Sequence, residues 1–262
     1  MTWRRGTGVA NNGAKTCFAL PSQNEWFFIH GRVSCDKAKH VFWAKFLPEI
    51  GLRRFLSNLI TEVSLPTASI DLAAVVLAAG QSTRMNSAVS KVLHEIAGEA
   101  LLGHVLAAVA SLDASPVVVV AGRGQDDVAG LASSQGAEVA IQDPPLGTGH
   151  AVLQARAALE GFGGDIMVVY GDTPLIRPET LQLLIDRRHQ ADNPAVVVFG
   201  FRPADPALYG RLVLDDSDHL ARIVEARDAN ETEKAINLCN GGVMVLDGAI
   251  AFDLLANLGN DN

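Results

Sequence analysis

From Asp71 onward, hydrophobic residues recur in short β-branched runs that alternate with longer segments whose apolar positions have helical spacing. A short continuous apolar run is typical of a strand that is buried on both faces, as in a parallel sheet. We predict five such strands, at residues 73–77, 117–121, 137–141, 166–170 and 195–201.

The segments between these strands predict helices at residues 101–112, 125–134, 148–159 and 178–190, the last beginning with Pro178 and Glu179 as helices often do. Alternating strands and helices predict an α/β fold, with a mostly parallel sheet flanked by helices. Ligands of such sheets bind beyond the carboxyl ends of the strands. We therefore look for a site in the loops that follow the strands.

The pattern changes at both ends of this region. After residue 205, YGRLVLDDSDHLARIVEA predicts a hairpin around an Asp-Ser-Asp turn. Residues 1–70 hold all three Trp and six of the ten Phe but show little sustained period, apart from a helix-like segment at 40–59 that Pro48 and Gly51 would interrupt. We divide the chain into an extension of unknown structure, residues 1–70, and a main domain, residues 71–262.

Charge separates the same two parts. Residues 1–70 carry nine Lys/Arg and four Asp/Glu, whereas the remainder carries twelve and twenty-five, a formal charge of −13. An acidic main domain argues against general nucleic-acid binding but leaves room for a local basic pocket that binds phosphate.

The cysteines and the apolar runs restrict the class of protein further. Cys17, Cys35 and Cys239 are far apart and include no CxxC pair, which predicts reduced thiols and no zinc site. No apolar run approaches the roughly 18 residues of a membrane span, and the amino terminus does not have the pattern of a secretory signal. We expect a cytoplasmic protein that binds neither membrane nor nucleic acid.

The segment LAAGQSTRMNSAVSK follows the first predicted strand and is the first candidate site. The small residues Ala78, Ala79 and Gly80 would let a phosphate approach the backbone, and Arg84 and Lys91 add positive charge. The segment matches neither GxGxxG nor GxxxxGK[ST], so it supports neither a dinucleotide fold nor a Walker loop. By residue type alone, a phosphate-binding loop and a plain strand-to-helix turn are equally good interpretations of this segment.

Gln142 follows the third strand, and its amide can pair with the edge of a nucleobase. The turn at Gly147-Thr148-Gly149 permits close backbone approach, and Thr148 is suited to be the N-cap of the next helix. An ordinary loop followed by a helix cap is the alternative interpretation.

Asp172 follows the fourth strand in Tyr170-Gly171-Asp172, where a lone carboxylate would suit Mg²⁺ or simply begin a turn. Gly210, Glu225 and Asn240 are residue types that can hold sugar hydroxyls, although each is also ordinary in a hairpin. Four histidines have no partner at ligand or triad spacing, so we interpret them as ordinary residues: His94, His104, His150 and His219.

In this order and spacing, the motifs resemble the uridylyltransferase domain of bacterial N-acetylglucosamine-1-phosphate uridylyltransferases. LAAGQSTRM…SK also occurs in the wider class of sugar nucleotidyltransferases and molybdenum-cofactor guanylyltransferases, whereas IQDPPLGTGHA, VVYGDTPLI, YGRLV, RIVEARDA and CNGGV narrow the resemblance. It covers residue 71 to about the end of the chain, and implies the Rossmann-like fold of nucleotide-diphospho-sugar transferases.

The resemblance implies transfer of UMP from UTP to N-acetylglucosamine 1-phosphate with Mg²⁺, giving pyrophosphate and the UDP-N-acetylglucosamine used in peptidoglycan and lipopolysaccharide synthesis. In-line attack of the sugar phosphate on the α-phosphorus needs positioning and charge stabilisation. The implied roles are nucleotide binding by Leu77, Ala78, Ala79, Gly80, Gln142, Gly147 and Thr148, catalysis by Arg84 and Lys91, Mg²⁺ binding by Asp172, and sugar binding by Tyr170, Gly210, Glu225 and Asn240.

The sequence departs from the family pattern at three places. Ser90 replaces the proline before the signature lysine, Asn240-Gly241-Gly242 replaces Asn-Thr-Gly, and the family's second metal ligand, an Asn, would lie past Asn262. The family's β-helix acetyltransferase domain is also missing. We therefore expect a nucleotidyltransferase domain, incomplete at its carboxyl end, that is monomeric, binds nucleotide weakly and turns over poorly or not at all.

Residues 1–70 have no counterpart in the family, so they are interpreted as a lineage-specific extension or the result of a start codon assigned too far upstream. Two competing functions stay open. One is a nucleotidyltransferase for another sugar phosphate or for molybdopterin, and the other is a non-catalytic nucleotide-binding fragment.

Overall fold

The computed structural model describes residues 16–21, 26–31, 70–80, 89–216 and 218–257. The chain divides into two compact units, one formed by Met1–Val33 with Asp71–Asn262 and the other by Ser34–Ile70. Apart from Ile70, the described residues all belong to the first unit. The helix expected at 40–59 lies outside the described residues.

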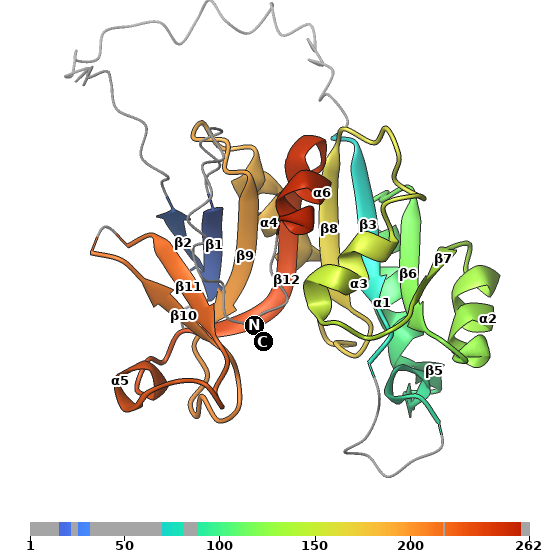
Figure 1. Ribbon diagram of the computed structural model, residues 1–262, viewed down its shortest axis with the longest axis horizontal. Helices are drawn as coiled ribbons and strands as arrows, with labels where there is room; N and C mark the ends of the chain where they lie inside the picture. The colour runs from blue at the N-terminus through green and yellow to red at the C-terminus, as the bar shows by residue number, and fades with distance from the viewer. Residues whose placement is uncertain (1–15, 22–25, 32–69, 81–88, 217, 258–262) are drawn as a thin grey trace, which may run out of the picture. The chain divides into compact units, whose positions relative to one another are not determined.

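A central sheet organises the first unit, and its strands lie in the order β2-β1-β9-β12-β8-β3-β6-β7 (Figure 1). The hairpin of β10 and β11 joins this sheet through β12, and β4 with β5 forms a small separate ribbon. The strand bounds are β1 Thr16–Pro21, β2 Trp26–Gly31, β3 Leu72–Leu77, β4 Glu95–Ile96, β5 Glu99–Ala100, β6 Val117–Gly122, β7 Glu138–Gln142, β8 Asp165–Tyr170, β9 Val196–Phe201, β10 Arg211–Leu214, β11 Leu220–Val224 and β12 Cys239–Asp247.

The predicted mostly parallel sheet is confirmed. β3 pairs in parallel with β6 and β8, and β6 pairs in parallel with β7. The five predicted strands agree with β3, β6, β7, β8 and β9 to within one residue at each end. From β9 to β7 in this order, β12 is the strand that runs in the opposite direction, because it is antiparallel to both β8 and β9.

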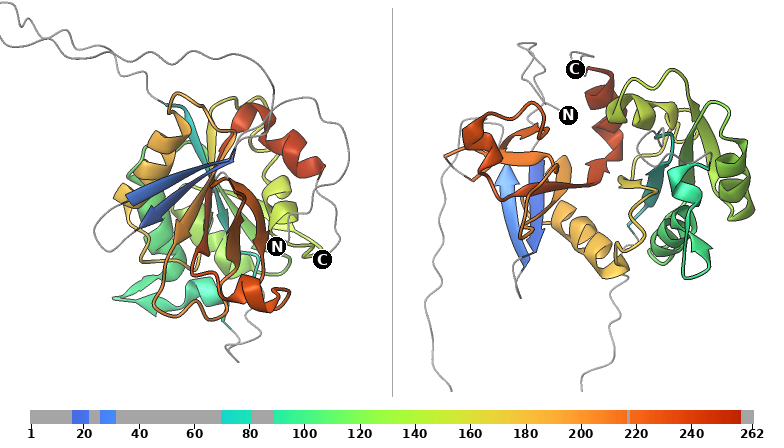
Figure 2. Two further views of the ribbon diagram at one scale, coloured as in Figure 1. Left: turned by 90° about the vertical axis from the view of Figure 1, so that its left-hand side faces the viewer. Right: turned by 90° about the horizontal axis from the view of Figure 1, so that it is seen from below.

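Helices cover both faces of this sheet (Figure 2). Alternate residues of β3 separate the two cores: Ala74 and Val76 pack with α1, α2 and α4, whereas Ala73 and Val75 pack with α3 and α6. Both sets are fully buried, which explains the unbroken apolar run in the sequence. The helices are η1 Lys91–Leu93, α1 Leu101–Ala110, α2 Asp126–Ser134, α3 Thr148–Gln154, α4 Pro178–Arg188, α5 Glu231–Lys234 and α6 Gly248–Ala256.

The helix predicted at 148–159 is shorter than expected. α3 ends at Gln154, and residues 155–161 continue as turns. Gly161 adopts a φ of 77°, in the left-handed region that favours glycine. The chain thus leaves the helical path after Gln154, and Gly161 allows the later turn that leads to β8 at Asp165.

Two strands come from residues that the sequence pattern assigned to an extension of unknown structure. β1 pairs in parallel with β9, with Thr16 opposite Val196, and β2 pairs antiparallel with β1. Residues 16–21 and 26–31 thus share the sheet of the main domain. Their local pattern did not predict this, since pairing at a sheet edge depends on a strand far away in the sequence.

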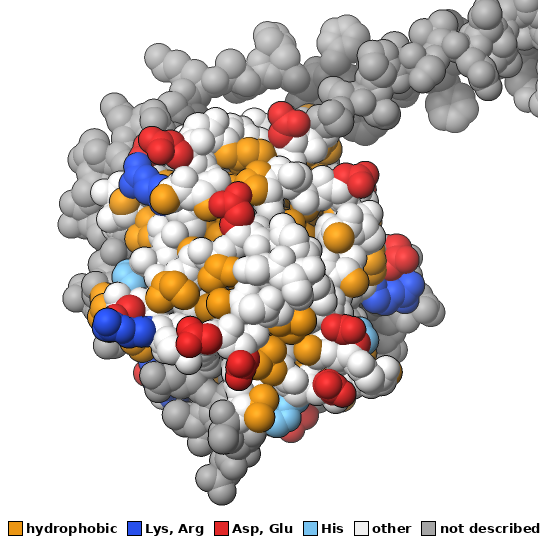
Figure 3. Space-filling model, turned by 90° about the vertical axis from the view of Figure 1, so that its right-hand side faces the viewer, with side chains coloured by type: hydrophobic (Ala, Val, Ile, Leu, Met, Phe, Trp, Pro, Cys, Tyr) orange, Lys and Arg blue, Asp and Glu red, His pale blue; other side chains and the backbone are white. Residues whose placement is uncertain are grey.

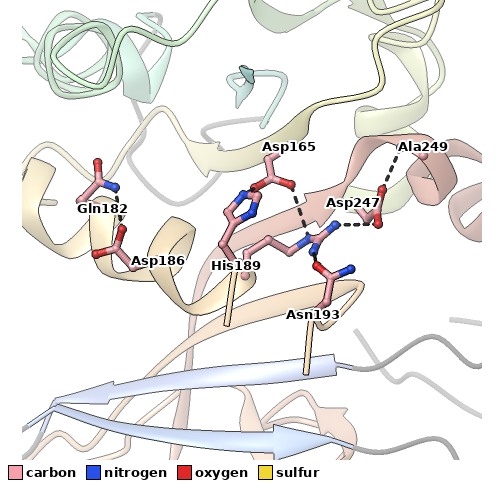
Figure 4. A network of polar contacts seen from close by, with 8 residues as sticks. Asp165, Gln182, Asp186, His189, Asn193, Asp247 and Ala249 are labelled. Atoms are coloured by element: carbon pink, nitrogen blue, oxygen red, sulfur yellow. Dashed lines mark hydrogen bonds and ion pairs between the residues drawn. The ribbon is translucent and has the colours of Figure 1, made fainter. Parts of the chain in front are cut away.

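A buried polar network lies at the amino end of β8 (Figure 4). Asp165 is 4% exposed, with its carboxylate 2.7 Å from His189 Nε2 and 3.4 Å from Arg188 Nε. Arg188 Nη2 also lies 2.6 Å from Asp247 Oδ2, and Asp247 caps α6 by accepting a hydrogen bond from the Ala249 N–H. These contacts tie β8, α4 and the β12–α6 junction together at the end of β8 opposite Tyr170.

Burial raises the pKa of Asp165, and the neighbouring charges of Arg188 and His189 oppose that rise. The network therefore combines a desolvation cost with close charge pairing.

Candidate active site

Residues from several strands meet at the carboxyl edge of the parallel strands. Leu77, at the end of β3, lies opposite both Tyr170 of β8 and Val120 of β6, and Gln142 ends β7 opposite Gly122. Because β12 is antiparallel to β8, with Met244 opposite Val168, the amino-terminal residues of β12 reach this same edge. The topology thus collects the predicted nucleotide and sugar residues on one side of the sheet.

The loop after β3 begins with small residues. Ala78 and Ala79 are buried, whereas Gly80 is exposed. The Ala78 N–H donates to the Val120 carbonyl at 2.8 Å, so it is not available to bind a phosphate. Ala78 would therefore contribute to nucleotide binding only through its small side chain. Arg84 lies outside the described residues, and its expected role stays a prediction.

Lys91 and Asp172 form an ion pair, with Nζ 2.6 Å from Oδ2. Their side chains are 48% and 30% exposed, so both remain accessible to a ligand. The loop that presents Asp172 is held by the Gly171 N–H, which donates to the Leu77 carbonyl at 2.9 Å. The sequence suggested separate roles for this lysine and this aspartate, but it carried no sign that the two touch.

Gln142 is 6% exposed, and its Nε2 donates to the Gly147 carbonyl at 3.0 Å. The same Nε2 lies 3.2 Å from His150 Nδ1, on α3. The residues expected to read a base are thus in contact. His150 was interpreted from the sequence as an ordinary histidine, but its ring contacts Gln142 and so belongs to this group. Its position two residues after Thr148 in LGTGHA was the one feature of the sequence that could have indicated this.

The prediction that Thr148 is the N-cap of its helix is wrong. Gly147 is the N-cap, with a φ of 100°, and Thr148 is the first helical residue. The left-handed φ of Gly147 makes the sharp entry into α3 without help from a side-chain cap. The Thr148 hydroxyl points elsewhere, since its Oγ1 lies 3.5 Å from the Tyr170 hydroxyl.

Tyr170 connects the base side of the site to the sugar side. Burial raises the pKa of its phenol, the hydrogen bond with Thr148 opposes that rise, and the negative charges of Glu225 and Asp172 add to it. The phenol therefore lies within electrostatic reach of both carboxylates. A Cβ placed on Gly242 would come within 2.4 Å of the Tyr170 ring, so glycine lets β12 pass close against this side chain.

The other three residues expected around the sugar are also together. A Cβ on Gly210 would lie 3.6 Å from Glu225 Oε1 and 3.7 Å from Asn240 Cβ. The Asn240 N–H donates to the Gly210 carbonyl at 2.8 Å, and Asn240 Oδ1 accepts from the Gly242 N–H at 2.9 Å. These bonds hold Asn240 in a fixed orientation and leave its side-chain NH₂ as the available donor.

The described residues contain no group of three or more His, Cys, Asp or Glu that could hold a metal ion. Mg²⁺ does not need such a group, because it usually takes one or two carboxylates together with waters and substrate phosphates. A single accessible carboxylate at Asp172, beside a lysine, fits that chemistry.

The surface around α2 and β7 shows scattered acidic and hydrophobic side chains, with basic ones toward its margins (Figure 3). Among the described residues, this face shows no broad basic patch of the kind that binds a nucleic-acid backbone. In the part of the chain that the structure describes, every helix is too short or too polar to cross a membrane.

Comparison with known proteins agrees with this fold. Residues 74–235 match the model of the MobA-like NTP transferase domain. The bifunctional protein GlmU of Novosphingobium aromaticivorans is 49% identical over 191 residues, which cover 73% of this chain and 42% of that protein. GlmU of Rhodospirillum rubrum is 50% identical over 190 residues, with coverages of 72% and 42%. The chain therefore spans about two fifths of the curated relatives it matches.

Two solved structures share the fold. UDP-glucose pyrophosphorylase complexed with UDP-glucose has a TM-score of 0.57 and 18% identity, covering 74% of this chain and 82% of its own. CMP:2-keto-3-deoxy-manno-octonic acid synthetase complexed with CTP has a TM-score of 0.55 and 16% identity, with coverages of 72% and 79%. At these identities the likeness shows the fold alone, which is that of nucleotide-sugar transferases.

Proposed function

Because the chain belongs to the MobA-like NTP transferase family, we propose that it transfers UMP from UTP to N-acetylglucosamine 1-phosphate, releasing pyrophosphate and UDP-N-acetylglucosamine. About 50% identity to two GlmU proteins over most of this chain supports a sugar-phosphate uridylyltransferase within that family. The product would supply peptidoglycan and lipopolysaccharide synthesis, and the reaction would take place in the cytoplasm, where UTP is made.

One observation carries the proposal most directly: Tyr170 links the three parts of the site. Its hydroxyl is 3.5 Å from Thr148 on the base side, and its pKa responds to the charges of Glu225 on the sugar side and of Asp172. A nucleotide, a sugar phosphate and a cation placed along these residues would be neighbours. That is the arrangement that attack on an α-phosphorus requires.

Each group has a definite task in this proposal. Gln142 and the Gly147-Thr148 turn hold the base, and Glu225 and Asn240 hold the sugar, so the sugar phosphate is aimed in line at the α-phosphorus. Lys91 places a positive charge where negative charge is transferred to the departing pyrophosphate.

Asp172 would hold Mg²⁺, which when bound neutralises phosphate charge and orients phosphate oxygens. Lys91 and Asp172 already neutralise each other at 2.6 Å, so the phosphates and the cation would replace this internal pair with external partners.

Pyrophosphate release by the purified chain, with UTP, N-acetylglucosamine 1-phosphate and Mg²⁺, tests the proposal. We expect release that depends on all three and UDP-N-acetylglucosamine as the product. Calorimetric titration with UTP, CTP and GTP should accompany this assay. Turnover with a guanine nucleotide in place of UTP would contradict the proposal and favour a molybdopterin-type enzyme. Binding of UDP-N-acetylglucosamine without any turnover would favour a non-catalytic role.

A further inference from the structure

The amide of Gln142 can take only one orientation. Its Nε2 carries two protons, one of which donates to the Gly147 carbonyl at 3.0 Å, while the other faces His150 Nδ1 at 3.2 Å. If the amide were flipped, its oxygen would face the Gly147 carbonyl oxygen, and two acceptors would repel each other. Within the described residues no hydrogen bond is made to the side-chain oxygen Oε1 of Gln142.

This orientation requires a particular tautomer of His150. To receive a proton from Gln142, Nδ1 must be the unprotonated nitrogen of a neutral imidazole, with the proton on Nε2. Gln154 competes for the ring, because its Nε2 lies 3.2 Å from His150 Nε2. A neutral imidazole has one acceptor nitrogen, so it cannot accept from both amides at once.

Burial decides this competition. Gln142 is 6% exposed, so an Nε2 proton that lost His150 would stay unpaired, at a high cost. Gln154 is only partly buried, and its Nε2 also donates to the His150 carbonyl at 3.0 Å, so it has that bond and can reach water. The imidazole therefore accepts from Gln142.

We propose that His150 is a positioning residue that, together with the Gly147 carbonyl, holds the Gln142 side-chain oxygen as a hydrogen-bond acceptor toward the base, so that the site selects a base with a ring N–H. This inference rests on the proposed function, in which the nucleotide is UTP. Uracil carries a proton at ring nitrogen N3, whereas N3 of cytosine is itself an acceptor. A Gln142 held with its oxygen outward therefore accepts from uracil and opposes cytosine at the same position. Without His150, only the Gly147 carbonyl among the described residues would oppose rotation of the amide, and the preference for a ring N–H would weaken.

Two variants of His150 separate positioning from packing. In His150→Asn the side-chain Oδ1 stands the same number of bonds from the backbone as Nδ1, so an acceptor for Gln142 remains. His150→Leu keeps a similar bulk but removes the acceptor. The Kd of the full chain for UTP and for CTP, each with excess Mg²⁺, would be measured by calorimetry, and thermal unfolding would check that every variant folds.

For the wild-type chain we expect tighter binding of UTP than of CTP. His150→Leu should reduce the UTP-to-CTP affinity ratio about tenfold, as expected for one lost hydrogen bond. His150→Asn should keep the ratio within about threefold of wild type, since the Oδ1 of the asparagine replaces His150 Nδ1 as a neutral acceptor. In a Gln142→Leu background, His150→Leu should change the ratio no further, because His150 acts through Gln142.

Three results would overturn the inference: an unchanged ratio in a folded His150→Leu, an equal loss in His150→Asn and His150→Leu, or a further loss in the Gln142→Leu background. The wild-type titration separates this failure from that of the proposed function. A wild-type chain that does not prefer UTP refutes the function itself, whereas a wild-type preference that survives His150→Leu refutes only the role of His150.

Discussion

Replacement of Gly242 by alanine should strain the centre of the site. Gly242 has a φ of 81°, where an L-residue is disfavoured, and a Cβ would lie 2.4 Å from Tyr170 Cε2 and 2.7 Å from Cδ2. The left-handed backbone costs about 1–2 kcal/mol for a residue with a Cβ. Pushing a methyl group against a packed ring costs about 1–3 kcal/mol more. Together these terms predict that Gly242→Ala lowers the free energy of unfolding by about 3 kcal/mol.

The ring cannot move away cheaply, because Tyr170 ends β8 and its hydroxyl approaches Thr148. Urea denaturation followed by circular dichroism measures the effect as a lower midpoint with an unchanged m-value. Gly130→Ala in α2 is the matched control, since its Cβ would meet no atom within 4 Å and its φ is not in the left-handed region. That control should be neutral or more stable by roughly 0.5–1 kcal/mol.

A double variant isolates the contact with the ring. In a Tyr170→Ala background every ring atom is gone, so Gly242→Ala should cost only its backbone strain, about 1–2 kcal/mol. The reasoning is refuted if Gly242→Ala stays within about 0.5 kcal/mol of wild type, or if its cost is the same with and without the Tyr170 ring.

Three other changes test the remaining charges. Asp172→Asn should weaken UTP binding in the presence of Mg²⁺ by about tenfold, as calorimetry would show. Mg²⁺-free binding should stay the same or become tighter, because the Asp172 carboxylate no longer competes for Lys91, and an equal loss with and without Mg²⁺ would contradict a metal role. Arg188→Leu should lower the free energy of unfolding by about 3–5 kcal/mol, because Asp165 and Asp247 both lose the buried Arg188 guanidinium as a partner. A urea midpoint near that of wild type would refute this. Because the pKa of Asp165 is raised in the folded protein, its contribution to stability is fully present below the ordinary aspartate pKa and is lost as pH rises through the raised pKa. Wild type should therefore lose stability relative to Asp165→Asn across that pH window, and a difference between the two unfolding free energies that is constant with pH would count against this reasoning.

The local pattern of apolar and polar residues was sufficient to predict the strands of the central sheet and the edge at which ligands would bind. The apolar run at 73–77 is continuous because residues such as Ala74 and Val75 are buried on opposite faces of the sheet, and the same holds for β6 and β8. Parallel strands end at one edge, so residues that follow them, such as Gln142 and Asp172, could be assigned to a common site from the sequence. These properties depend on neighbours along the chain, which a sequence displays directly.

Only the tertiary structure decided which side chains meet. Lys91 and Asp172 are 81 positions apart, and no periodicity indicates that their charges pair. Gly242 reaches Tyr170 because β12 enters the sheet antiparallel beside β8, and strand order of this kind is set by long-range packing. The contact between His150 and the Gln142 amide also depends on tertiary packing, because it requires α3 to lie against the end of β7. The sequence thus determined the elements and the edge at which they bind, while packing between distant elements determined the contacts that make that edge a site.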